Sequence, residues 1–311
     1  MASTPVPDTG LGQGAGEPAA APAPVPDAAP GAGSGAVRAG RGAERRDPAT
    51  EVTITFLPGD NIRSNVETAA HLRRAGFDPV PHIAAREIAS REVLNDFLFN
   101  LRSEADVRRV LLIAGDVAAA RGPFKSSRDV AASGLLQAHG ITCVSIAGHP
   151  EGHPYLDEDA AFRSLADWRD WSDASGIRVD IVTQFCFEAA PILKFLRELG
   201  TRGIALPVIV GLAGPATPAT LTKFALRCGI GNSIRVLRGQ IGRYGRLLID
   251  AAPDEVVRGL QTAPSEATAA IAGFHLFPFG GLRKSANWLR NRPEAELGQL
   301  HPQVSTLHPN P

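Results

Sequence analysis

Two histidines flank a glutamate in the segment HPEGHP. His149, Glu151 and His153 are residue types that bind metal ions, act as general acids and bases, or contact a bound ring. A proline follows each histidine, which disfavours the helical arrangement of many zinc sites. We therefore predict a ligand-contacting turn and no metal, with a purely structural turn as the alternative.

Polar residues also interrupt two apolar segments. LIAGD ends in Gly115 and Asp116, where the glycine lets a ligand approach the backbone and the aspartate accepts hydrogen bonds from a ligand or caps a helix. TQFCF places Gln184 in an apolar strand, where a buried amide needs partners from neighbouring strands or from a bound heterocycle. Both interpretations of each residue stay open.

The elements around these residues alternate between two periodicities. From residue 51 onward, short apolar segments rich in β-branched residues alternate with amphipathic helical segments, which predicts a parallel sheet. The predicted strands span residues 52–57, 79–84, 109–115, 142–147, 180–187, 207–213 and 273–279. The predicted helices span residues 64–76, 90–104, 126–140, 159–176, 189–200 and 219–229, with a longer helical region at about 243–262.

Two α/β folds fit this alternation, a doubly wound sheet and a (β/α)8 TIM barrel. The chain has no GxGxxG or GxxxxGK[ST] phosphate loop. Polar residues instead recur at or near the carboxyl ends of successive strands, where a barrel assembles its active site. These residues are Thr55, His82, Asp116, His149, Gln184 and His275. We predict the barrel, possibly lacking its first strand, because only seven strands are evident and residues 1–50 contain nothing strand-like. Two sheet edges would then be unpaired.

The composition limits the domain organisation and the partners. Ala, Pro and Gly supply 30 of the first 50 residues, so we predict a disordered tail at 1–50, a barrel domain at 51–290 and a disordered tail at 291–311. The 32 basic and 32 acidic residues give no net charge and no case for nucleic acid or an anionic membrane. No apolar stretch is long enough for a membrane span, and three cysteines without a CxxC pair favour a reducing cytoplasm.

The segment FGGLRKS follows the last predicted strand. Arg283 and Lys284 come after two glycines there, at a place where barrels often bind a phosphate or carboxylate. Trp168, Trp171 and Trp288 lie on helical segments, and we expect them to pack against the core.

Five motifs, in order and spacing, resemble the methylenetetrahydrofolate reductase family. They are PHIAAR 81–86, AGD 114–116 with GPFKSSRDV 122–130, HPEGHP 149–154, VTQFCF 182–187 and FHLFPF 274–279, within a resemblance that runs from about residue 51 to 289. The resemblance implies a flavin-bearing barrel that passes a hydride from NAD(P)H to FAD and then to 5,10-methylene-tetrahydrofolate, giving 5-methyl-tetrahydrofolate. It also implies a folate substrate and a homo-oligomer.

The resemblance assigns roles to single residues. The implied flavin contacts are Thr55, His82, Gly115, Asp116, His149 and His153. The implied substrate contacts are Gln184 and Arg283, and the catalytic candidates are Asp116, Gln184 and Glu151. Ala114 stands where the family has an arginine, and Gly280 and Gly281 stand where it has Asn-Arg. In the helix after HPEGHP, the segment LADWRDWSDASG offers Arg169 among aspartates.

The glutamate on the first strand of the family has no evident counterpart. Only 27 positions separate Thr55 from His82, which leaves room for one helix, so residues 52–57 correspond to the second strand of the family. The nearest acids are Glu44 and Glu51. A folate-binding barrel without the reductase activity, acting as carrier or regulator, and a flavin-free reductase are therefore the alternative functions.

Overall fold

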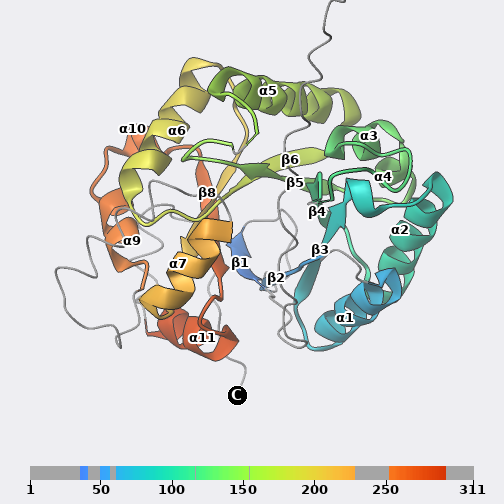
Figure 1. Cartoon of the computed structure of the whole chain (residues 1–311), viewed down its shortest axis with the longest axis horizontal. Helices are drawn as coiled ribbons and strands as arrows, with labels where there is room; N and C mark the ends of the chain where they lie inside the picture. Colours follow the sequence, from blue (N-terminus) through green and yellow to red (C-terminus); the bar gives the residue numbers. More distant parts are fainter. Residues whose placement is uncertain are drawn as a thin grey trace, which may run out of the picture. The chain divides into compact units, whose positions relative to one another are not determined.

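Eight strands form a closed barrel in chain order in the computed structural model (Figure 1). The structure describes residues 36–40, 50–56, 61–115, 117–153, 155–227 and 252–291, all within one compact unit, Gly33–Pro311. The strands are β1 Ala36–Gly40, β2 Glu51–Ile54, β3 Asp78–Ala84, β4 Arg109–Ile113, β5 Cys143–Gly148, β6 Arg178–Thr183, β7 Val208–Ala213 and β8 Ile271–Phe277.

Strands β2 to β8 are the seven predicted strands, and they are parallel. Their boundaries differ from the predicted ones by a few residues, most at the carboxyl ends of β2 and β6. The predicted fold class, an α/β TIM barrel that possibly lacks its first strand, is confirmed.

The place of the missing strand is taken by β1, which runs antiparallel to both of its neighbours. Val37 is paired with Val52 of β2 on one side and with Leu276 of β8 on the other. The prediction that residues 1–50 contain nothing strand-like, and that two edges stay unpaired, is therefore wrong for residues 36–40. An Ala- and Gly-rich segment carries no alternating apolar pattern, and its pairing depends on backbone groups that β2 and β8 present.

Ten α-helices among the described residues surround the strands (Figure 1). They are α1 Ile62–Arg74, α2 Arg91–Ala105, α3 Ser127–Ala132, α4 Leu135–Ala138, α5 Glu158–Ser175, α6 Ala189–Thr201, α7 Pro218–Arg227, α9 Asp254–Gln261, α10 Ser265–Thr268 and α11 Leu282–Arg290, with a 3₁₀ turn, η1, at Ala85–Glu87. The predicted helix 126–140 is divided by Gly134, whose φ of +74° ends helical geometry. Of the predicted region 243–262, residues 243–251 lie outside the described part.

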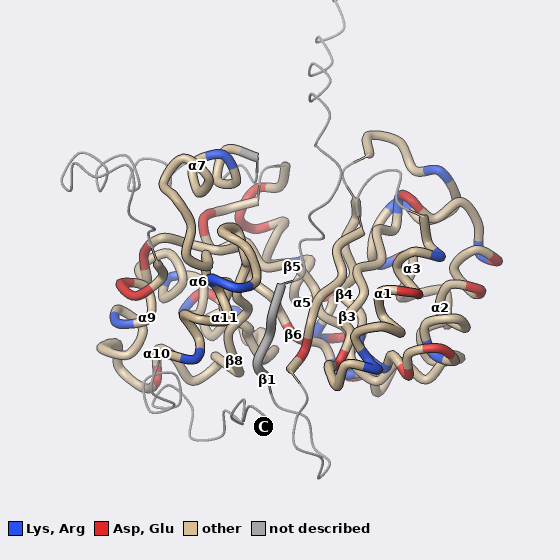
Figure 2. The backbone as a smooth tube through the Cα atoms, turned by 90° about the horizontal axis from the view of Figure 1, so that it is seen from below, with Lys and Arg blue, Asp and Glu red and all other residues tan. Residues whose placement is uncertain are grey.

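Local sequence explains where the helices begin and end. The Ser90 hydroxyl accepts a hydrogen bond from Val93 N at the start of α2, and Asp106 ends that helix in the left-handed conformation. Ser126 and Asp129 form a capping box at the start of α3. Acidic and basic residues alternate over the outer helices, as Figure 2 shows for α1, α2 and α9. None of the described helices is both long and apolar enough to cross a membrane.

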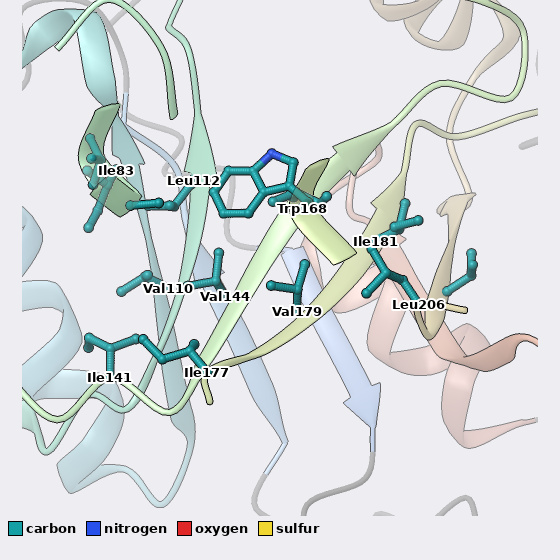
Figure 3. Packing of buried hydrophobic residues seen from close by; sticks show 14 of the residues in the cluster. Ile83, Val110, Leu112, Ile141, Val144, Trp168, Ile177, Val179, Ile181 and Leu206 are labelled. Atoms are coloured by element: carbon teal, nitrogen blue, oxygen red, sulfur yellow. The ribbon is translucent and has the colours of Figure 1, made fainter. Parts of the chain in front are cut away.

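The strands bury two apolar layers, one on each side. The layer between strands and helices contains Ile83, Leu112, Val144, Ile181 and Trp168 (Figure 3). Trp171 and Trp288 pack against the same layer, so the prediction that the tryptophans pack against the core is confirmed. The second layer, inside the barrel, contains Val80, Leu111, Val182 and Ile209.

A buried ionic network lies at the amino ends of three strands. The Arg109 guanidinium of β4 lies 2.9 Å from a Glu51 carboxylate oxygen of β2 and 2.5 Å from one of Asp180 in β6. The Cys143 thiol is 3.5 Å from the same Asp180 oxygen. Burial opposes the charge of Arg109, but the two carboxylates outweigh it and raise its pKa. Glu51 is therefore held at the end of the barrel opposite to the polar strand ends.

Candidate functional site

The alternation of side chains along a strand shows which predicted site residues point into the barrel. Side chains two residues apart on a strand lie on the same face. Val80 belongs to the interior layer, so His82, two positions later in β3, faces the interior. Val182 is likewise an interior residue, and Gln184 follows it by two positions.

The carboxyl end of the interior is open among the described residues. Ala147 is exposed although it lies within β5, between β4 and β6. Its neighbours Val144 and Ile146 belong to the helix-facing layer, so the exposed Ala147 side chain faces inward. The amino end of the same interior is closed by the apolar layer and the Arg109 network. Among the described residues, the open side of the interior is therefore the one where the polar strand ends lie.

His82 is a half-buried polar residue on this part of the interior wall. Its Nε2 atom is buried and has no hydrogen-bond partner in the described part of the chain. Burial lowers the pKa of His82 to about 4, so the ring is neutral near pH 7. A buried ring nitrogen without a protein partner is the kind of atom that a ligand satisfies.

The HPEGHP segment is a turn. Gly152 N donates to His149 O at 3.0 Å, and Gly152 has a φ of +100°. The His149 and His153 rings meet edge to face, with centroids 4.6 Å apart. His153 Nδ1 accepts hydrogen bonds from Tyr155 N and Leu156 N, both at 3.1 Å, which leaves Nε2 as the ring atom available to a ligand. Within the ranges that the structure describes, no group of three His, Cys, Asp or Glu side chains could hold a metal ion.

The turn meets the end of β6. Gln184 N donates to Gly148 O at 2.7 Å, so the backbone just before His149 is hydrogen-bonded to the backbone of Gln184. Burial lowers the pKa of His149 to about 4, helped by the neighbouring His153. Burial raises the pKa of the Cys186 thiol, as do the charge of Glu151 and a hydrogen bond to it. The structure thus places Glu151 beside Cys186, which belongs to the helix-facing layer, and joins the start of the turn to Gln184 through the backbone.

Gln184, Gly115 and Thr55 lie at or just beyond the carboxyl ends of their strands. The half-buried Gln184 side-chain amide has no hydrogen-bond partner among the described residues. Gly115 follows β4 with a φ of +93°, and an added Cβ would lie 3.4 Å from Ala84 Cβ. Thr55 is half-buried just after β2. Asp116 lies outside the described residues, so its placement beside Gly115 stays a prediction.

The predicted cationic residues lie away from the interior. Arg283 is exposed in the first turn of α11. Arg169 donates to Gly203 O at 2.9 Å, in the loop before β7 and thus at the opposite end of the barrel. The first turn of α5, next to the HPEGHP turn, carries Glu158 and Asp159 instead.

A cluster of phenylalanines also borders this end and was not predicted as part of the site. Phe185 packs against Phe187, Phe277 and Phe279, with ring centroids 4.7 to 5.7 Å apart. Phe224 of α7 stacks on Phe279 at 4.3 Å. Four of these rings are only partly buried, so they offer an apolar face to a planar ligand. The alternating aromatic residues of FCF and FPF at two strand ends were the available signal.

Comparisons with known proteins agree on one family. The family model described as methylenetetrahydrofolate reductase matches residues 37–231. A 5,10-methylenetetrahydrofolate reductase of Pectobacterium carotovorum subsp. carotovorum is 28% identical over 175 residues, and one of Salmonella typhimurium is 25% identical over 175 residues. Each match covers 56% of this chain, which spans 56% of the length of each of these relatives.

Proposed function

Because the chain belongs to the methylenetetrahydrofolate reductase family, we propose that it is a flavin-dependent reductase of a folate. In this proposal NAD(P)H reduces bound FAD, which supplies the hydride that converts 5,10-methylene-tetrahydrofolate to 5-methyl-tetrahydrofolate. One observation carries the proposal. The polar side chains of His82 and Gln184 lack a hydrogen-bond partner among the described residues, and each follows an interior residue of its strand toward the carboxyl end of the barrel.

The described residues fit the ring end of a flavin. His82 Nε2 needs a partner, Gly115 permits close approach of a ring, and the exposed Ala147 leaves the space beside them open. Thr55, His149 and His153 border the same end. The diphosphate would be held elsewhere on the rim, because Glu158 and Asp159 at the start of α5 disfavour an anion there. Lys125 is an exposed cation for that role.

Distinct side chains would serve the folate. The Gln184 amide can donate to and accept from the edge of a pterin. His149 is neutral near pH 7 and a poor proton donor, which leaves Glu151, by its position alone, as the candidate for the acid that assists opening of the methylene bridge. Asp116 would lie near both rings, as the resemblance implies. The exposed Arg283 suits the carboxylate-bearing tail of the substrate.

One observation favours a second function, a folate-binding barrel without reductase activity. The place of the first parallel strand is held by the antiparallel β1, whose sequence AVRAG contains no acidic residue. A carrier or regulator of this kind would bind the folate and leave it unchanged.

Half-reactions of the purified full chain separate the two functions. We expect visible flavin absorbance, bleaching by NADH or NADPH, and recovery on adding 5,10-methylene-tetrahydrofolate. Gln184→Ala should slow the recovery about tenfold, the size of one lost hydrogen bond, and leave the bleaching unchanged. Gln137→Ala, at an exposed position of α4, is the matched control. A protein that binds the folate but shows neither flavin nor turnover would be the non-reducing barrel.

A further inference from the structure

Arg86 connects η1 to the loop that follows β4. Its Nε donates to Lys125 O at 3.0 Å, and its Nη1 lies 3.4 Å from Val117 O. Its backbone N donates to Ala114 O at 2.9 Å, and its backbone O accepts from Arg121 N at 2.8 Å. One residue therefore contacts four points of the segment 114–125.

Further contacts hold the loop at residues 114–125 against η1 and the residues that follow it. A Cβ at Gly122 would lie 2.3 Å from Ala89 O, so the loop backbone passes directly over the end of η1. The Arg121 guanidinium lies 3.2 Å from the carboxylate of Glu87, which is almost fully buried. These contacts fix the far end of the loop, whereas the Arg86 side chain is the one that reaches Val117, beside position 116.

We infer that Arg86 is a positioning residue for the backbone at Ala114 and Val117, at the start of the loop that follows β4. The side chain of Ala114 is too short to hold this backbone itself. The planar guanidinium can donate to two carbonyl groups at once in a fixed geometry, which a lysine cannot do. Loss of the guanidinium would therefore free the backbone at Val117 and Lys125.

The inference deepens the proposed function and rests on it for its catalytic consequence. If the residue at position 116 acts at the flavin and the pterin, displacement of the backbone at Ala114 and Val117 slows the folate half-reaction. The order of the loop itself does not depend on any activity, so it is tested separately.

Limited proteolysis tests the order of the loop. Trypsin cleaves after Arg121 and Lys125, and we expect Arg86→Gln to raise the rate of cleavage at these bonds about fivefold, because local opening becomes easier. Arg86→Lys should be cleaved at a rate between those of the wild type and Arg86→Gln. Arg169→Gln, which removes a similar bond from a guanidinium to a carbonyl at the opposite end of the barrel, should leave these rates unchanged. Equal rates in wild type and Arg86→Gln would overturn the inference.

A double-mutant cycle tests the catalytic consequence. Arg86→Gln and Asp116→Asn should each slow flavin reoxidation by methylene-tetrahydrofolate about tenfold or more, with reduction by NAD(P)H unchanged. The double variant should be no slower than Asp116→Asn alone. The control Arg169→Gln should by itself leave both half-reactions at the wild-type rate, because Arg169 makes its bond at the opposite end of the barrel. If the two substitutions slow the reaction by factors that multiply in the double variant, Arg86 does not act through this part of the loop. If the wild-type protein shows no folate turnover but trypsin still cleaves Arg86→Gln faster, the proposed function is refuted and Arg86 remains the residue that orders the loop.

Discussion

At the scale of single residues, the site consists of polar groups kept neutral by burial. His82 and His149 both have pKa values lowered to about 4, so neither carries a charge near pH 7. Neutral rings can donate through one nitrogen and accept through the other, which suits a heterocyclic ligand better than an anion. The sequence placed these residues at strand ends, but only the packing around them determines their protonation.

The buried histidine predicts a loss of stability in acid. Unfolded His82 binds a proton near pH 6.5 and folded His82 only near pH 4, so the free energy of unfolding should fall as pH drops through this range. The loss from this residue is on the order of 3 kcal/mol. Urea unfolding from pH 7 to 4 should show a smaller loss for His82→Gln. His71→Gln, at an exposed position of α1, should keep the wild-type profile; identical profiles for all three proteins would refute the role of His82.

At the scale of elements, charged residues at the starts of three strands tie the barrel together. Glu51, Arg109 and Asp180 begin or nearly begin β2, β4 and β6, and their side chains meet inside the barrel. Each charge looked like an ordinary strand end in the sequence. Their association depends on barrel closure, because residues 51, 109 and 180 are brought together only when the strands are in register.

Removal of the central cation should therefore be costly. Arg109→Leu leaves two carboxylates in a buried site, and we expect a loss of about 3–5 kcal/mol in the free energy of unfolding. Arg63→Leu removes an ion pair with Glu104 whose partners are 52% and 32% exposed, and should leave the free energy of unfolding nearly unchanged. Urea unfolding at pH 7 measures both. Equal losses of unfolding free energy in the two variants would mean that the Arg109 network does not stabilise the barrel.

At the scale of the whole molecule, closure of the barrel depends on β1. This strand pairs with both β2 and β8, which would otherwise be edges of an open sheet. Exposed edges of this kind pair with other chains and cause aggregation.

Two truncations test the closure. A chain starting at residue 33 keeps β1, and we expect it to unfold at the same urea concentration as the full chain. A chain starting at residue 46 lacks β1, and we expect a lower unfolding midpoint and more light scattering on storage because two strands lose their neighbour. If the two truncated chains behave alike, β1 does not stabilise the barrel.

The sequence by itself determined the parallel strands, the helices between them and the polar residues at the strand ends. Those features follow from local periodicity, which each segment carries without reference to the others. Tertiary structure alone decided three other features: the antiparallel β1, the Arg109 network and the phenylalanine cluster around Phe185. Each depends on groups that are distant along the chain and meet only when the barrel closes, so a local pattern such as FCF or FPF can mark the residues but not their association.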